Sequence, residues 1–146
     1  MTSRPEFISL DYGIKRVGVA RSVLGTRLVL PVCTINLSNN KKTHGTEVLR
    51  HLEDNELMPT NKLIVGYPIG MNNQPTEQTK IVDSFIDQIK SKCDGLVIDT
   101  VDERLSSSEA RLILTNSRKK TKRMDGAIDM SSAVIILNSY LEAMRD

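Results

Sequence analysis

Acidic residues stand at the ends of two expected strands, where their side chains could act together. Asp11 closes the alternating run FISLD, in which Ile8 and Leu10 share one face and Asp11 lies on the other. Asp102 and Glu103 follow the run LVIDTV, and because successive side chains of a strand alternate, only one of this pair can share the face of Asp11. Open α/β sheets place ligands outside the carboxyl ends of their strands, which predicts one crevice bordered by both ends.

A third carboxylate stands near the start of an expected C-terminal helix. Asp129 precedes Ala133 and Leu137 at four-residue steps, so it lies on the stripe that faces the sheet. An Asp in a first turn could instead serve only the helix dipole, and Asp125, one turn earlier, competes for the same position. Beside the acids of the two strand ends, we favour a ligand role for Asp129.

Such a group of acids indicates a metal site. Converging carboxylates repel one another unless a hard cation neutralises them, and oxygen ligands without His or Cys suit Mg²⁺ or Mn²⁺. Two such ions about 4 Å apart can activate a water on one side of a phosphodiester and stabilise the leaving oxygen on the other. The pattern therefore favours a metal-dependent nuclease.

A strongly basic stretch lies between the two later acids, from Ser117 to Met124. Charge runs are commonly solvated loops, but one beside an acidic site can hold a phosphate backbone that the acids alone would repel. The basic residues are Arg118, Lys119, Lys120, Lys122 and Arg123.

The expected elements follow the order βββαβαβαα. Strands over 7–11, 17–20 and 28–35 predict an antiparallel meander, with Pro31 suited to an edge strand or a bulge. The other expected elements are a helix over 43–56, a strand over 62–66, a helix capped by Thr76, a strand over 96–101, a helix over 110–114 opened by a Ser106–Glu109 capping box, and a helix from about Ile128. We expect an α/β fold with a mixed five-stranded sheet, three antiparallel strands followed by two added through helices, flanked by helices.

Length and composition predict one soluble domain over residues 1–146. With 39% hydrophobic residues, 26% charged residues and a net charge of +2, the average charge alone does not indicate a nucleic-acid binder. Cys33 and Cys93 lack metal-ligand spacing and are expected as reduced, buried thiols. We see neither an apolar signal segment nor a membrane span, so we expect a cytoplasmic protein without a membrane partner.

Four stretches in order along the chain together resemble the YqgF family. They are DYGIKRVGVA at 11–20, VGYP at 65–68, DERLSSSEAR at 102–111 and DMSSAVIILNSYLEA at 129–143. That family comprises nucleases of the ribonuclease H-like fold, described as pre-16S rRNA nucleases and as relatives of Holliday-junction resolvases. The resemblance covers nearly the whole chain and implies the same fold and a hydrolase acting on phosphodiester bonds.

Carried over by position, the resemblance puts the family's metal-binding and catalytic acids on Asp11, Glu103 and Asp129, and it disfavours Asp125. It implies Mg²⁺ or Mn²⁺ as cofactor, and processing of the 5′ end of precursor 16S ribosomal RNA, with ribosomal particles as further partners. Basic residues near these acids are expected to contact the nucleic acid. They are Lys15, Arg16, Arg104 and the five residues of the basic stretch.

Two positions depart from the family pattern, and other functions remain open. Ile14 stands where the family usually has Thr, and GMNNQ at 70–74 replaces an Asn-Met-Asp-Gly turn, although both leave the acids intact. The alternatives are a resolvase of branched DNA and a catalytically silent factor that binds RNA or ribosomes. A nucleotide-binding domain of the actin and sugar-kinase type is disfavoured, because those proteins clamp ATP between two such domains. The sequence predicts no oligomeric state.

Two tyrosines, Tyr12 and Tyr67, border the expected site loops. Each could stack on a base or pack as a loop anchor. We expect both to pack.

Overall fold

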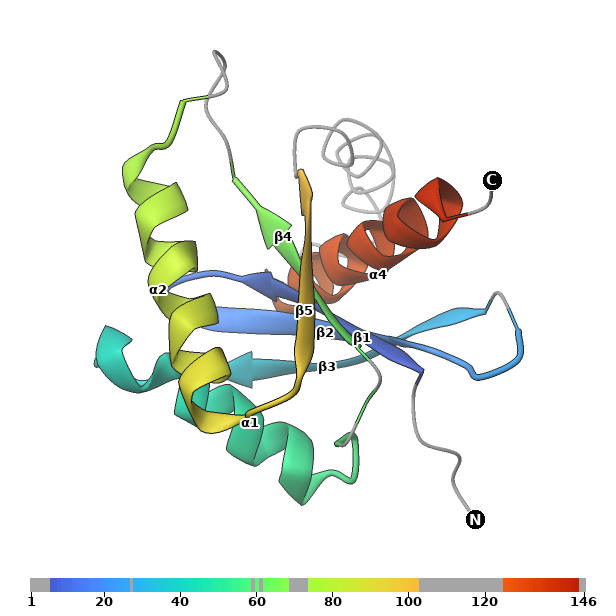
Figure 1. Ribbon diagram of the computed structural model, residues 1–146, viewed down its shortest axis with the longest axis horizontal. Helices are drawn as coiled ribbons and strands as arrows, with labels where there is room; N and C mark the ends of the chain where they lie inside the picture. Colours follow the sequence, from blue (N-terminus) through green and yellow to red (C-terminus); the bar gives the residue numbers. More distant parts are fainter. Residues whose placement is uncertain are drawn as a thin grey trace.

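Five strands form one mixed sheet in the computed structural model, with the order β3-β2-β1-β4-β5 (Figure 1). The strands are β1 Phe7–Tyr12, β2 Arg16–Ser22, β3 Val29–Asn36, β4 Lys62–Tyr67 and β5 Val97–Asp102. The first three are antiparallel neighbours, as predicted, and β4 and β5, which are added through helices, run parallel to β1. The structure describes residues 6–26, 28–58, 60, 62–68, 74–102 and 125–144, and in the last range it describes side chains from 132 onward.

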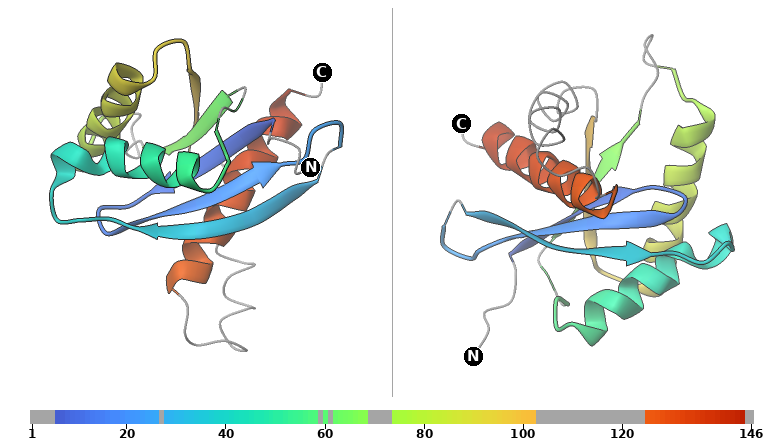
Figure 2. Two further views of the ribbon diagram at one scale, coloured as in Figure 1. Left: turned by 90° about the horizontal axis from the view of Figure 1, so that it is seen from below. Right: turned by 180° about the vertical axis from the view of Figure 1, so that it is seen from behind.

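Helices cover both faces of this sheet (Figure 2). They are the 3-10 helix η1 Lys41–Thr43, α1 His44–Asp54, α2 Glu77–Lys92 and α4 Asp125–Ala143. α1 and α2 share a core with one face, and α4 packs on the other. As predicted, Thr76 caps α2, its hydroxyl accepting a hydrogen bond from the backbone N–H of Thr79. Among the described helices, none is long and apolar enough to cross a membrane.

The start of α4 differs from the prediction. The helix begins at Asp125 rather than near Ile128. Its first three residues are DGA, which carry no large apolar side chain, so hydrophobic periodicity could not reveal this turn. The predicted helix over 110–114 and its Ser106–Glu109 capping box lie outside the described residues.

Strand alternation divides β1 between two apolar cores. Ile8, Leu10 and Tyr12 are buried on the face of α1 and α2. Phe7 packs on the opposite face against α4, and the buried Ser9 hydroxyl donates a hydrogen bond to the same helix. The two faces predicted for the run FISLD are therefore confirmed.

The outer strand β3 shows both features that Pro31 indicated. It lies at the edge of the sheet, and the register shifts because Val19 pairs with Cys33 while Ala20 pairs with Pro31. Cys33 and Cys93 are free thiols, as expected, but both are only half-buried. The first lies on this edge strand and the second at the C-terminal end of α2, where the core covers only one side of each.

A polar cluster fastens the C-terminal half of α4 to β4 and β5. The Tyr140 hydroxyl accepts a hydrogen bond from Lys62 Nζ at 2.6 Å and donates one to Asp99 Oδ2 at 2.6 Å. Lys62 Nζ also lies 3.2 Å from the same carboxylate oxygen. The Tyr140 hydroxyl, followed by Lys62, holds the pKa of Asp99 below its ordinary value.

The two helices on the other face, α1 and α2, approach each other closely at Gly45. A Cβ at this position would lie 2.5 Å from the Cβ of Gln88 on α2. The Gly45 N–H donates a hydrogen bond to Gln88 Oε1 at 2.8 Å, so backbone and side chain meet directly. Glycine is required here because it leaves room for that contact.

We expect Gly45→Ala to lower the free energy of unfolding by roughly 1–3 kcal/mol, because the added methyl group overpacks this contact. Alanine is the better helix former by about 1 kcal/mol, so any net loss reports the clash. Urea denaturation measures the change, with Glu53→Ala at an exposed position of α1 as control. A Gly45→Ala protein as stable as the wild type would contradict the close approach.

Candidate active site

Asp11 is flanked on both neighbouring strands by glycine. It pairs with Gly18 across the antiparallel β1–β2 ladder, and the parallel register of β1 and β4 brings Gly66 level with it on the other side. Both glycines are buried, whereas Asp11 is half-buried. Since glycine has no side chain, the carboxylate stands between two stretches of bare backbone. This arrangement places no side chain directly opposite Asp11 on either neighbouring strand.

The packing of α4 on β1 shows which end of the helix lies near the carboxyl end of the strand. The Phe7 and Tyr140 rings meet edge to face, with centroids 5.9 Å apart. Two residues further along β1, the Ser9 hydroxyl donates to the carbonyl oxygen of Ala133 at 2.6 Å. Where the two elements cross, β1 and α4 therefore run in opposite chain directions. The turn of α4 that contains Asp129 thus extends toward the carboxyl end of β1.

The three predicted ligands are described to different extents. Asp11 lies on the α4 face of β1, two residues beyond Ser9. Asp129 and its rival Asp125 both lie in α4, one helical turn apart, but their side chains are outside the described part of the chain. Glu103 directly follows β5 and is also outside it.

The end of β5 bears on the choice between its two acids. Asp99 accepts a hydrogen bond from α4, and Val101 packs in the same cluster as that helix. Asp102 is in register with Tyr67, which packs with the core on the opposite face. Alternation therefore assigns Asp102 to the face of α1 and α2, away from Asp11. The same alternation continued by one residue favours Glu103, which stays a prediction.

Beside Asp11, a buried chain of hydrogen bonds holds the end of β1. The Tyr12 ring stacks on Phe85 with centroids 4.2 Å apart, and its hydroxyl lies 2.6 Å from Nδ1 of His44. His44 Nε2 lies 2.8 Å from the carbonyl oxygen of Ser38. A carbonyl only accepts, so Nε2 carries the proton and Nδ1 accepts from the tyrosine hydroxyl. Burial, followed by the charge of Glu47, raises the pKa of Tyr12.

The second tyrosine, Tyr67, also serves as an anchor. Its hydroxyl donates a hydrogen bond to Asp83 of α2 at 2.8 Å, and its ring packs on the core between the sheet and α2. The hydrogen bond to Asp83 raises the pKa of this phenol. Packing, rather than stacking on a base, is thus confirmed for Tyr12 and is the arrangement seen for Tyr67.

Like the predicted metal ligands, the residues predicted to contact nucleic acid are only partly within the described part of the chain. Lys15 is exposed in the turn between β1 and β2, and Arg16 is the half-buried first residue of β2. Ile14, the departure from the family pattern, is 41% exposed in the same turn. Arg104 and the five basic residues at 118–123 lie outside the described residues.

Sequence analysis alone missed two features of the site. The sequence contains the glycines Gly18 and Gly66, but only the strand register shows that they lie beside Asp11. His44 lies 32 positions from Tyr12, and no local pattern connects the two. Among the side chains that the structure describes, no three His, Cys, Asp or Glu residues are grouped to hold a metal ion, but only one of the three predicted ligands is in that set.

Comparison with known proteins identifies the family. The family model of RuvX, described as Holliday junction resolvase, matches residues 5–143. The chain belongs to this family. RuvX proteins are nucleases, hydrolases that act on phosphodiester bonds, and the predicted resemblance to the YqgF family is confirmed.

Proteins similar to this RuvX family member come from several bacteria. A relative from Parabacteroides distasonis is 34% identical over 141 residues, covering 94% of this chain and 95% of its own. One from Phocaeicola vulgatus is 32% identical over 145 residues, covering 94% of this chain and 96% of its own. Both bear the name "Putative pre-16S rRNA nuclease".

Solved structures confirm the ribonuclease H-like fold of this RuvX family member. Thermus thermophilus RuvC, in complex with a Holliday junction substrate, aligns with a TM-score of 0.58 at 12% identity, covering 95% of this chain and 96% of that one. Fowlpox virus resolvase, in complex with Holliday junction DNA, gives 0.56 at 14% identity, covering 96% and 99%.

We expect Tyr12→Phe to destabilise the protein by about 1–3 kcal/mol, because it leaves the buried Nδ1 of His44 without its donor. Chemical denaturation measures the loss. Tyr67→Phe is the matched control, since its hydroxyl bonds to an exposed carboxylate that water can serve equally well. Equal stability losses in the two variants would argue against the buried hydrogen-bond chain.

Proposed function

We propose that this protein is a metal-dependent ribonuclease that processes the 5′ end of precursor 16S ribosomal RNA in the cytoplasm, and that Asp11, Glu103 and Asp129 hold Mg²⁺ or Mn²⁺. Membership of the RuvX family and the names of the bacterial relatives support the reaction and the substrate. The observation that carries the site is the half-buried Asp11 carboxylate between Gly18 and Gly66 on the α4 face of the sheet.

The residues present fit a hard divalent cation. Asp11 supplies a carboxylate oxygen with bare backbone on each side, and Glu103 and Asp129 would add oxygens of the same kind. When bound, the metal would activate water and stabilise the leaving oxygen. The hydrogen-bond chain behind Tyr12 fixes the strand that presents Asp11.

Basic residues have a complementary task in this proposal. They neutralise the phosphate backbone that the acidic site would otherwise repel, and thereby hold the strand over the carboxylates. The residues assigned to this task are Lys15, Arg16, Arg104, Arg118, Lys119, Lys120, Lys122 and Arg123.

A branched-DNA resolvase is the second candidate, and the description of the matching family favours it. A cleavage assay of the purified protein on precursor 16S ribosomal RNA and on a four-way DNA junction separates the two, with arms containing Mg²⁺, Mn²⁺ or a chelator. We expect RNA cleavage that the chelator abolishes. Preferential junction cleavage would establish the resolvase, and binding of RNA without cleavage in any arm would indicate a catalytically silent factor.

Asp11→Asn should lose cleavage activity by orders of magnitude, because a missing ligand misplaces the metal relative to the reacting phosphate. Its melting temperature should stay unchanged or rise, since repulsion among the metal-free carboxylates is relieved. Initial rates and thermal unfolding are measured in parallel, with Asp54→Asn at the exposed end of α1 as control. Near-normal cleavage by Asp11→Asn or by Glu103→Gln would refute the metal site.

A separate comparison assigns the acid on α4. Asp129→Asn should abolish cleavage, whereas Asp125→Asn, one helical turn earlier, should stay within a few-fold of the wild-type rate. Single-turnover rates at saturating substrate measure both without the effect of weaker binding. The reverse ranking would move the ligand to Asp125.

A further inference from the structure

A second cationic surface lies on described residues beside the Asp11 end of the sheet. The segment 37–43, which we call the η1 loop, follows β3 and contains η1. Its first residue donates a backbone hydrogen bond to the carbonyl oxygen of Lys15 at 2.9 Å, in the turn that directly follows β1. At its other end, the loop leads into His44, whose ring contacts Tyr12. The η1 loop is therefore joined at one end to the turn that follows β1 and at the other, through His44, to Tyr12 beside Asp11.

Hydrogen bonds fix the backbone of the η1 loop. The side chain of Asn40 accepts from the N–H of Lys42 at 3.0 Å, and the Thr43 hydroxyl donates to the carbonyl oxygen of Asn40 at 3.0 Å. Gln88 of α2 donates from Nε2 to the carbonyl oxygen of Lys41 at 2.9 Å. The positions from which the two lysine side chains project are thus set in advance, which reduces the entropy lost on binding a ligand.

The carboxylate of Glu47, which contacts this loop, accepts its hydrogen bonds from neutral donors. Glu47 accepts hydrogen bonds from the N–H and the hydroxyl of Ser38 at 2.8 and 2.7 Å, and from the Thr43 hydroxyl at 2.7 Å. Lys15, Lys41 and Lys42 are exposed, and the structure gives none of the three a salt bridge to any residue that it describes. Three cations thus face solvent at one end of the sheet.

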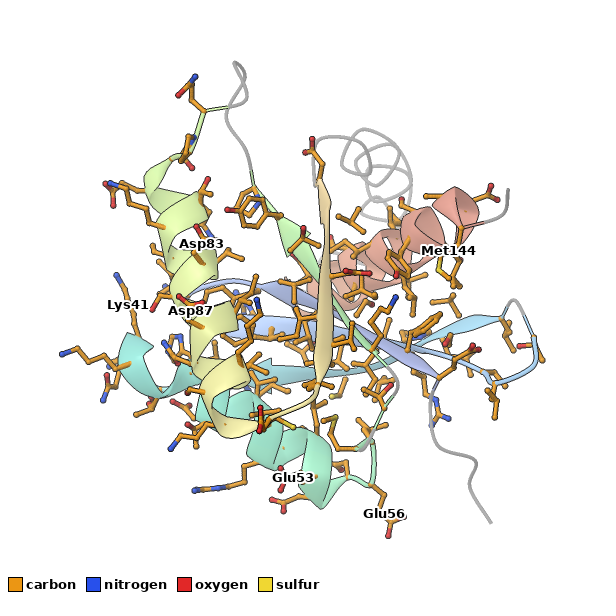
Figure 3. The ribbon with its side chains drawn as sticks, viewed as in Figure 1. Lys41, Glu53, Glu56, Asp83, Asp87 and Met144 are labelled. Atoms are coloured by element: carbon orange, nitrogen blue, oxygen red, sulfur yellow. The ribbon has the colours of Figure 1, made fainter. Side chains whose placement is uncertain are left out.

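Negative side chains border this surface on α2. Asp83 and Asp87, both labelled in Figure 3, are exposed on that helix, and Asp87 directly precedes Gln88, whose side chain bonds to the carbonyl oxygen of Lys41. A phosphate backbone would be repelled from the Asp83–Asp87 part of α2 and attracted to the β1–β2 turn and the η1 loop. The charge pattern therefore favours a polyanion that runs past the Asp11 end of the sheet without crossing this part of α2.

We propose that Lys15, Lys41 and Lys42 bind the sugar-phosphate backbone of the substrate strand beside the scissile bond. This inference rests on the proposed function, because it extends the substrate-binding surface of the same nuclease to residues of the η1 loop. The contacts are to phosphates, so binding through them is independent of sequence. RNA and DNA share this chemistry, and the experiment contains an arm for each.

The test compares two pairs of exposed lysines. The double variant Lys41→Gln/Lys42→Gln removes the charges of the η1 loop. The control, Lys90→Gln/Lys92→Gln, removes two exposed charges from the C-terminal end of α2, which leads into the amino end of β5. Fluorescence anisotropy measures the affinity for a labelled single-stranded RNA and for a four-way DNA junction over a salt series, in chelator so that no cleavage occurs. Both double variants change the net charge equally, so a difference between them reports position.

For the RNA, the η1 pair should flatten the slope of log affinity against log salt by about 1.4 and weaken binding at 0.1 M salt by on the order of tenfold, because each single-strand phosphate contact contributes roughly 0.7. Adding Lys15→Gln should flatten the slope by about 0.7 more. The control pair should leave the slope unchanged. In metal-containing buffer, turnover of the η1 pair at saturating substrate should fall much less than its affinity.

An unchanged slope in the η1 pair, or an equal change in the control pair, would overturn the proposal, as would a wild-type protein that binds neither nucleic acid at low salt. Failure of the proposed function has a different signature. In that case the wild type cleaves no substrate in any metal, while the slopes still show whether these lysines contact phosphate.

Discussion

The arrangement of the site depends on the close crossing of α4 over β1, where the Ser9 hydroxyl is bonded to the carbonyl oxygen of Ala133. Small side chains permit this approach, since Ser9 and its partner Ala20 on β2 are both fully buried, as is Ala133. A large residue at any of these positions would push the helix off the sheet. The crossing sets the distance and direction from β1 to the first turns of α4, and hence the position of Asp129 relative to the strand that carries Asp11.

The two faces of the sheet have different roles around Asp11. On one face, the buried chain from Tyr12 through His44 to Ser38 ties the end of β1 to α1 and to the η1 loop. On the other, Gly18 and Gly66 place bare backbone on each side of Asp11. In the proposed site, a half-buried carboxylate beside other carboxylates needs a rigid support, because repulsion would otherwise displace it. The packing of β1 against α1 and α2 supplies that support from the face opposite to Asp11.

Much of this could be predicted from the sequence, because alternation and capping are local. The run FISLD correctly predicted which side chains of β1 face each core, and Thr76 correctly predicted the start of α2. Features that depend on distant pairing could not be predicted. The bond between Tyr12 and His44 joins residues 32 positions apart, and the placement of glycine beside Asp11 follows from register between strands. Of the three predicted metal ligands, only Asp11 has a described side chain, so the set stays a prediction.

The bulged edge of β3 has a consequence for how the sheet meets other chains. An open edge is a template on which a further strand can add, and this one is eight residues long. Pro31 has no backbone N–H to offer, and the shifted register beside it increases the local twist. The hydrogen-bond ladder between β3 and an added strand would therefore be interrupted near the middle of β3. Protection against uncontrolled polymerisation is thereby built into the edge strand itself.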